Sequence, residues 1–326
     1  MAEPLDATFF AFKKRERNGV LFRLSVAFVI VAIALVGAFA ALFWTSIGPL
    51  ITWYGQIIQA AANNDTAAIE TAGIPPGFFG VIGGMLLWMF PFYILCAAFE
   101  AGALRWMIHG ETKGFMGLSL GAPTWRVWGV YWVWLLLNIA FSIIMTIVMS
   151  MVIGILAVGS GGDPAATMTA IPVVYVVQYG LMIYFAVRFA PAAAASIVRR
   201  KFAFFDSWTV TKGRFLPLFG SFFLLYAFYT LVSIGLAIAI FALVLGPAAP
   251  DLSAAVNDPA RFNQVLLEVF QTYIASLSNP QNWVVIGAVQ LIGTLFAVFF
   301  YVLMFGVNAR AAVAALEEGK IKPEGA

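Results

Sequence analysis

Few side chains in this sequence could catalyse a reaction or hold a metal ion. Hydrolysis at a zinc or di-metal site needs several His, Asp or Glu ligands together, yet His109 is the only histidine and Cys96 the only cysteine. A serine nucleophile needs a neighbouring base, and nothing in the sequence brings His109 to a serine. We therefore predict no catalytic residue, no metal site and no cofactor, and we expect Cys96 to be a small buried hydrophobic side chain.

Three charged residues near the ends of long apolar stretches are the best candidates for a site. Glu100 and Arg188 belong to the second and fourth stretches, and Arg310 takes the equivalent place in the sixth. An acid between two arginines is tolerated in a low-dielectric setting, whereas each charge alone is costly there. Three interpretations stay open: an ion-pair latch between helices, a lipid-headgroup or anion site, and unpaired side chains that snorkel to the interface.

Two further sets of polar residues are candidates. Arg199, Arg200 and Lys201 extend the possible headgroup site. A polar stripe with four-residue spacing lies in the third apolar stretch and consists of Asn138, Ser142, Thr146 and Ser150. Such a stripe either bonds neighbouring helices or lines a transport route. Pro91, about midway along the second stretch, would kink a helix there, as in the broken helices of transporters.

The elements that must position these residues are membrane-spanning helices. Apolar residues make up 63% of the chain and charged residues only 10%. A helix needs roughly 20 apolar residues to cross the hydrocarbon core, and the long runs lack the strict alternation of barrel strands. We therefore predict an all-α integral membrane protein with six transmembrane helices packed up-and-down. The spans are residues 24–53, 78–104, 127–158, 171–198, 216–245 and 283–308.

The basic residues predict the orientation of these helices. Seventeen of the eighteen lysines and arginines lie before the first span, in the second and fourth connections, or after the sixth span. Because basic connections are retained in the cytoplasm during insertion, we expect cytoplasmic segments at 1–23 and 309–326 on either side of a membrane domain at 24–308. The cluster at 188–215 is then mainly a topology signal. A phosphate or nucleic-acid role is the alternative, and anionic lipid headgroups would also be attracted.

Two patterns refine the predicted architecture. An aromatic residue and basic residues precede the first, third and fifth spans, and small residues follow the second, fourth and sixth. Three repeated helical hairpins explain this pattern, although amphipathic segments before each span would give it without duplication. Between the fifth and sixth spans, apolar residues from Phe262 to Leu277 have helical spacing with polar residues between them. This pattern predicts an amphipathic helix on the outer surface.

Residues 188–220 also resemble a known group of proteins. An arginine, a Pro-Ala-rich segment, Ser-Trp, Thr-Lys-Gly-Arg-Phe and Leu-Phe-Gly follow one another there. This order resembles uncharacterised six-helix inner-membrane proteins of bacteria and is similar to the membrane domain attached to some glycerophosphodiester phosphodiesterases. The resemblance implies a six-helix fold. It does not imply phosphodiesterase activity, which in that family resides in a separate soluble barrel.

These observations leave three classes of function. A non-catalytic inner-membrane scaffold or lipid-associated accessory protein explains the apolar interior and the inner ring of charge. A transporter or permease for a small molecule or lipid explains Pro91 and the polar stripe, and an enzyme is the third class. We expect the first, with anionic headgroups at the cytoplasmic face as partners and no nucleic acid. A membrane-protein partner or a homo-oligomer stays open.

Overall fold

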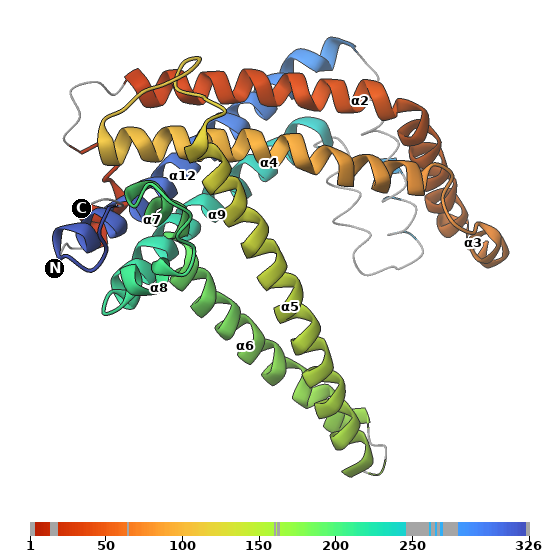
Figure 1. Ribbon diagram of the computed structural model, residues 1–326. Coiled ribbons are helices and arrows are strands. Elements are labelled where there is room, and N and C mark those ends of the chain that lie inside the picture. Colours follow the sequence, from red (N-terminus) through yellow and green to blue (C-terminus); the bar gives the residue numbers. More distant parts are fainter. Residues whose placement is uncertain are drawn as a thin grey trace. The chain divides into compact units, whose positions relative to one another are not determined.

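The computed structural model describes residues 4–13, 19–63, 65–159, 161, 164–245, 261, 265, 268–269 and 280–323. These residues form helices and their connections, with one isolated β-bridge between Phe115 and Leu118. Six of the described helices are long and apolar enough to cross a membrane. The predicted fold class is therefore confirmed: the chain is an all-α multi-pass membrane protein (Figure 1).

The helices are of two lengths. The long ones are α2 (Gly19–Ala62), α4 (Phe78–His109), α5 (Ala122–Gly159), α6 (Pro164–Phe189), α9 (Phe215–Leu245) and α12 (Pro280–Glu317). The short ones are α1 (Pro4–Thr8), α3 (Thr66–Thr71), α7 (Ala192–Val198) and α8 (Asp206–Thr211). Each long helix exceeds the roughly 20 residues that a span requires.

Several predicted boundaries differ from the observed ones; the first span, for example, was expected at 24–53, whereas α2 covers Gly19–Ala62. The fourth span was expected as one helix over 171–198, but α6 ends at Phe189 and α7 begins at Ala192. Pro191 lies between them, where it lacks an amide donor and disfavours helical geometry in the preceding residue. The sixth helix continues to Glu317, past the expected end at residue 308, because its last turns are rich in alanine.

The predicted outer helix at 262–277 falls mostly outside the described residues. Only Val265, Glu268 and Val269 of that segment are described, and all three are helical.

Consecutive long helices pair as antiparallel hairpins. Along each pair, ring contacts move forward on one helix as they move backward on the other. The contacts are Phe28–Phe99 and Phe39–Trp88 for α2 and α4, Trp134–Phe189 and Phe141–Phe185 for α5 and α6, and Tyr226–Phe300 and Tyr229–Phe296 for α9 and α12. Figure 1 shows α5 and α6 side by side in this way. The expected up-and-down connectivity within each hairpin is thus present.

The chain forms two compact units. Unit 1 comprises Met1–Phe28, Tyr93–Leu225 and Tyr301–Ala326, and unit 2 comprises Val29–Phe92 and Tyr226–Phe300. By sequence position, all lysines and arginines except Arg261 belong to unit 1. Unit 1 also contains the start of α2, α5 and α9 and the end of α4, α6 and α12. The helix ends that the basic residues assign to one side therefore share one unit, which also contains the opposite ends of α5 and α6.

Small residues pack the interior of unit 1. Seven alanines of α4, α7 and α12 are buried; they are Ala103, Ala192, Ala193, Ala194, Ala195, Ala311 and Ala312. A methyl group added to Gly102 would lie 2.8 Å from the carbonyl oxygen of Gly117. This close packing holds the connection after α4 against that helix.

Candidate functional site

The segment between α6 and α9 lies in unit 1 and contains the two short helices α7 and α8. Ser196 of α7 is fully buried, donates a hydrogen bond to the carbonyl of Ala192 at 2.8 Å and accepts one from the amide of Ala203 at 3.1 Å. This hydroxyl therefore fixes the turn that joins α7 to α8. We call the basic end the part of unit 1 that consists of residues 188–214 and 310–323.

The ion-pair latch, one of the three interpretations of Glu100, Arg188 and Arg310, is not what the structure shows. No ion pair joins these residues within the part of the chain that the structure describes. Glu100 is 5% exposed and accepts a 2.6 Å hydrogen bond from the hydroxyl of Tyr131 on α5. Its position near the end of an apolar stretch did not determine the direction of the Glu100 side chain.

Arg188 lies in an aromatic cage instead of beside a carboxylate. Its guanidinium carbon is 4.9 Å from the ring centroid of Trp208, 5.3 Å from that of Tyr184 and 5.7 Å from that of Phe215. It also donates hydrogen bonds to the hydroxyls of Tyr184 and Thr211, both at 3.3 Å. Aromatic faces attract a cation through their quadrupoles. The cage therefore stabilises the charge and holds α8 against α6.

We predict that Arg188→Lys lowers stability by about 1 to 2 kcal/mol, although it keeps the charge. An ammonium group cannot stack flat on three rings or donate from a planar fork. The measurement is the thermal unfolding midpoint in detergent. Arg126→Lys is the matched control, since Arg126 makes no ring contact in the described structure. Equal shifts for the two variants would show that the cage contributes nothing.

Arg310 has local partners. It pairs with Glu317 on the same helix at 3.1 Å, and its guanidinium lies 6.0 Å from the ring centroid of Phe10. Its side chain is therefore bound at the surface of α12 and does not reach α4 or α6.

The three neighbouring basic residues of the predicted headgroup site have different surroundings. Arg199 pairs with Asp206 and donates to the carbonyl of Lys322, so it joins α7, α8 and the C-terminal residues. Arg200 pairs with Glu111 at 3.1 Å, and its side chain is 62% exposed. Lys201 makes no ion pair with the described residues. Arg200 is thus exposed and Lys201 half-buried, whereas Arg199 has a structural role.

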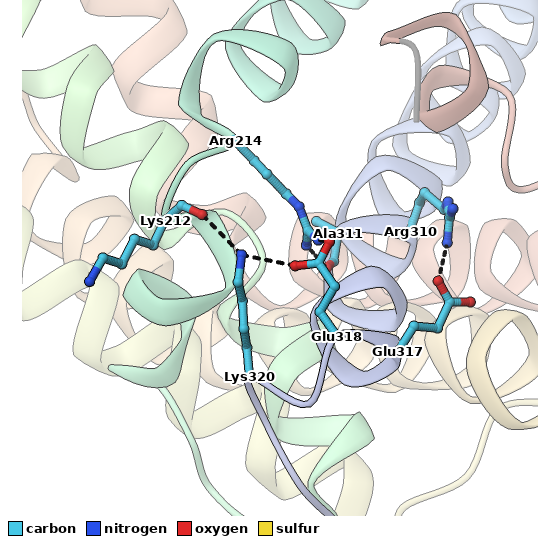
Figure 2. Close-up of polar contacts among 7 residues, drawn as sticks. All are labelled: Lys212, Arg214, Arg310, Ala311, Glu317, Glu318 and Lys320. Atoms are coloured by element: carbon cyan, nitrogen blue, oxygen red, sulfur yellow. Dashed lines mark hydrogen bonds and ion pairs between the residues drawn. The ribbon is translucent and has the colours of Figure 1, made fainter. Parts of the chain in front are cut away.

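The basic end contains a second charged group, centred on Glu318, that was not predicted from the sequence (Figure 2). Glu318 forms ion pairs with both Arg214 and Lys320, and the Lys320 ammonium lies 2.9 Å from the Glu318 carboxylate. Arg214 also donates to the carbonyl of Ala311 at 3.4 Å, and Lys320 to that of Lys212 at 3.4 Å. The hydrogen bond from Lys320, with further help from Arg214, lowers the pKa of Glu318 below its ordinary value. Glu318 is therefore an anion at neutral pH.

Arg105 is a buried arginine that sequence reasoning placed in a connection. It donates to the carbonyl of Gly117 at 3.3 Å and to the hydroxyl of Ser119 at 2.9 Å. Gly117 to Gly121 fits the Gly-x-Ser-x-Gly pattern of hydrolases, which sequence reasoning overlooked. That pattern requires a strand–turn–helix context and a histidine. Here the segment connects two helices, and His109 contacts the carbonyl of Ile197 at 3.2 Å, so Ser119 is a structural residue.

The polar stripe of α5 bonds to its own backbone. Asn138 donates to the carbonyl of Trp134 at 2.8 Å, Thr146 to that of Ser142 at 2.8 Å and Ser150 to that of Thr146 at 2.9 Å. Short polar side chains in helices often bond the carbonyl four residues earlier. These three donors thus bond their own helix, and none of them is seen to bond a neighbouring helix in the described structure.

The glycines at positions 80 and 84 contact α2 within unit 2. A methyl group on Gly84 would lie 2.6 Å from the ring of Phe43, and one on Gly80 would overlap the side chain of Ser46. Their Gly-x-x-x-Gly spacing therefore reports helix packing.

Metal chemistry finds no support in the described residues, where no group of three or more His, Cys, Asp or Glu side chains could hold an ion. Comparisons with known proteins add nothing further: no family model, no curated protein and no solved structure matches this chain.

Proposed function

We propose that this chain is a non-catalytic protein of a bacterial inner membrane, a scaffold or lipid-associated accessory protein whose basic end faces anionic headgroups at the cytoplasmic surface. The observation that supports this proposal is the gathering of the basic residues in unit 1, at alternate helix ends. A scaffold role implies a membrane-protein partner or a second copy of the chain. Nucleic acid has no part in it.

The accessible charges of the basic end suit a headgroup layer. Arg200, Lys201 and Lys212 are not enclosed by the fold, and Arg200 has only a surface ion pair. Surface pairs contribute little stability, whereas each basic residue near an anionic leaflet gains roughly 1 kcal/mol. Replacing the Glu111 partner of Arg200 by lipid phosphates would therefore be favourable.

Aromatic side chains beside these charges support the same placement. Phe202, Phe205 and Trp208 are exposed along the segment that leads into and forms α8. Aromatic residues concentrate at membrane–water interfaces because their rings contact the acyl boundary while polar neighbours remain hydrated. This segment would therefore lie at the headgroup level, with α6 and α9 entering the hydrocarbon on either side.

The proposal is tested by the lipids that the protein retains during purification in mild detergent. We expect phosphatidylglycerol to be enriched over phosphatidylethanolamine, as measured by mass spectrometry of the bound lipids. Combined Lys201→Gln and Lys212→Gln replacement should reduce this enrichment severalfold, because two accessible charges are lost. The control is Arg261→Gln, which removes the basic residue outside unit 1. An unenriched lipid pool in the wild-type protein would contradict the proposal.

Transport is the competing hypothesis, motivated by Pro91 and the polar stripe. Pro91 does lie inside α4, but Asn138, Thr146 and Ser150 of the stripe donate to carbonyls of their own helix, so these donors are already engaged. A permease would move solute across the membrane of reconstituted vesicles. We also expect that the lipid preference of this protein does not depend on Asn138.

A further inference from the structure

The carboxylate of Glu318 is held by two cations from separate parts of the chain. Arg214 immediately precedes α9, whereas Glu318 and Lys320 follow α12. In Figure 2 the Arg214 and Lys320 side chains converge on this one carboxylate, while Glu317 points to Arg310. The two acids at the end of α12 thus have different partners.

Arg214 is more enclosed than the acid that it binds. Its side chain is 15% exposed, against 49% for Glu318. The hydrogen bond to the Ala311 carbonyl fixes one amino group of the guanidinium, and the other faces Glu318. A covered guanidinium without an anion is costly, so this position requires an anion. Glu318 supplies one from a side chain that can rotate into solvent.

We propose that Arg214 and Lys320 form a binding site for the phosphate group of an anionic lipid, and that Glu318 occupies this site until a lipid displaces it. A phosphate presents the same pair of oxygens to a guanidinium as a carboxylate does. This inference rests on the proposed function, since it assumes that the basic end meets anionic headgroups.

The surroundings of Arg214 favour a lipid over free phosphate. Arg214 adjoins the first residue of α9, and that helix exposes Leu216 and Phe223. These side chains would contact acyl chains if the headgroup lay at Arg214. Free phosphate would gain nothing from them.

The exchange needs only the Glu318 side chain to move. The residues after it stay attached, because Ile321 is buried and Arg199 binds the carbonyl of Lys322. Lys320 is therefore kept beside Arg214 after Glu318 turns away.

The test titrates the purified full chain in detergent with dioleoylphosphatidylglycerol, dioleoylphosphatidylcholine and inorganic phosphate, with binding measured by native mass spectrometry. Glu318→Gln should tighten phosphatidylglycerol binding about 5- to 10-fold, because the internal competitor is removed. Arg214→Gln should weaken it about tenfold or more through the lost charged hydrogen bonds. Glu317→Gln is the matched control: it removes the same charge beside Arg310 and should leave the affinity unchanged.

Four results would overturn the inference. Equal gains for Glu318→Gln and Glu317→Gln would reduce the effect to overall charge, and no gain for either would show that Glu318 does not compete. Equal affinity for inorganic phosphate would assign the site to the free anion, and equal affinity for phosphatidylcholine would exclude a preference for anionic lipid. If Arg214→Gln fails to fold, the Glu318→Gln comparison still decides.

The same titration separates this inference from the proposed function. In one outcome, the wild-type protein prefers phosphatidylglycerol, the Lys201→Gln and Lys212→Gln replacements remove that preference, and Glu318→Gln has no effect. This outcome would support the proposed function and contradict only the Arg214–Lys320 site. If the wild-type protein has no preference for the anionic lipid, both the proposed function and the proposed site are contradicted.

Discussion

Tyr131→Phe is expected to destabilise the protein by about 1 to 3 kcal/mol, because it leaves the buried Glu100 without the one hydrogen bond that the described residues provide. The measurement is the free energy of unfolding in detergent micelles. Tyr93→Phe is the control, since the Tyr93 ring packs on that of Tyr131 at 5.9 Å but its hydroxyl makes no hydrogen bond within the described part of the chain. Its effect should stay within about 0.5 kcal/mol.

A double-mutant cycle then tests whether Tyr131 acts through Glu100. Glu100→Leu removes the buried charge, so Tyr131→Phe in that background should cost much less than it does alone. If both backgrounds lose the same free energy on Tyr131→Phe, the hydrogen bond is not what couples α4 to α5.

Gly114→Ala is expected to have the second large effect, a loss of at least about 3 kcal/mol. Gly114 has a φ of +83°, and an added methyl group would overlap the carbonyl oxygen of Leu118. The substitution therefore combines left-handed strain with a backbone clash. Relief of the clash would displace Ser119, whose hydroxyl accepts a hydrogen bond from Arg105. Thermal unfolding in detergent measures the loss.

Two other glycines separate the causes. Gly213 also has a positive φ, of +76°, but open space around it, so Gly213→Ala should cost only the conformational strain of about 1 to 2 kcal/mol. Gly121→Ala meets only ordinary contact with Pro123 and should be close to neutral. A Gly114→Ala variant no less stable than Gly213→Ala would show that the connection adjusts without cost.

The fold class could be predicted from the sequence because membrane spans depend mainly on length and hydrophobicity. The antiparallel pairing of α5 and α6 follows in part from their short connection, and the buried alanines of α7 and α12 follow from their small size. Hydropathy did not detect the break at Pro191, because a proline changes backbone hydrogen bonding with little change in apolar character.

The partners of the charged residues could not be predicted in the same way. Depth along a helix identified Glu100, Arg188 and Arg310, but rotation about the helix axis and packing decide what each one contacts. Tyr184, four residues before Arg188, was a local signal for a ring contact. Trp208 and Tyr131 come from other elements, so only the tertiary structure brings them to Arg188 and Glu100.

The side of the membrane that the basic end faces can be measured directly with single cysteines. In a Cys96→Ser background, Asp65→Cys and Lys201→Cys place one thiol in unit 2 and one in the basic end of unit 1. Because the basic connections are expected in the cytoplasm, a membrane-impermeant maleimide applied to intact cells should label position 65 and should label position 201 only after permeabilisation. Labelling of position 201 in intact cells, with position 65 protected, would contradict a cytoplasmic basic end.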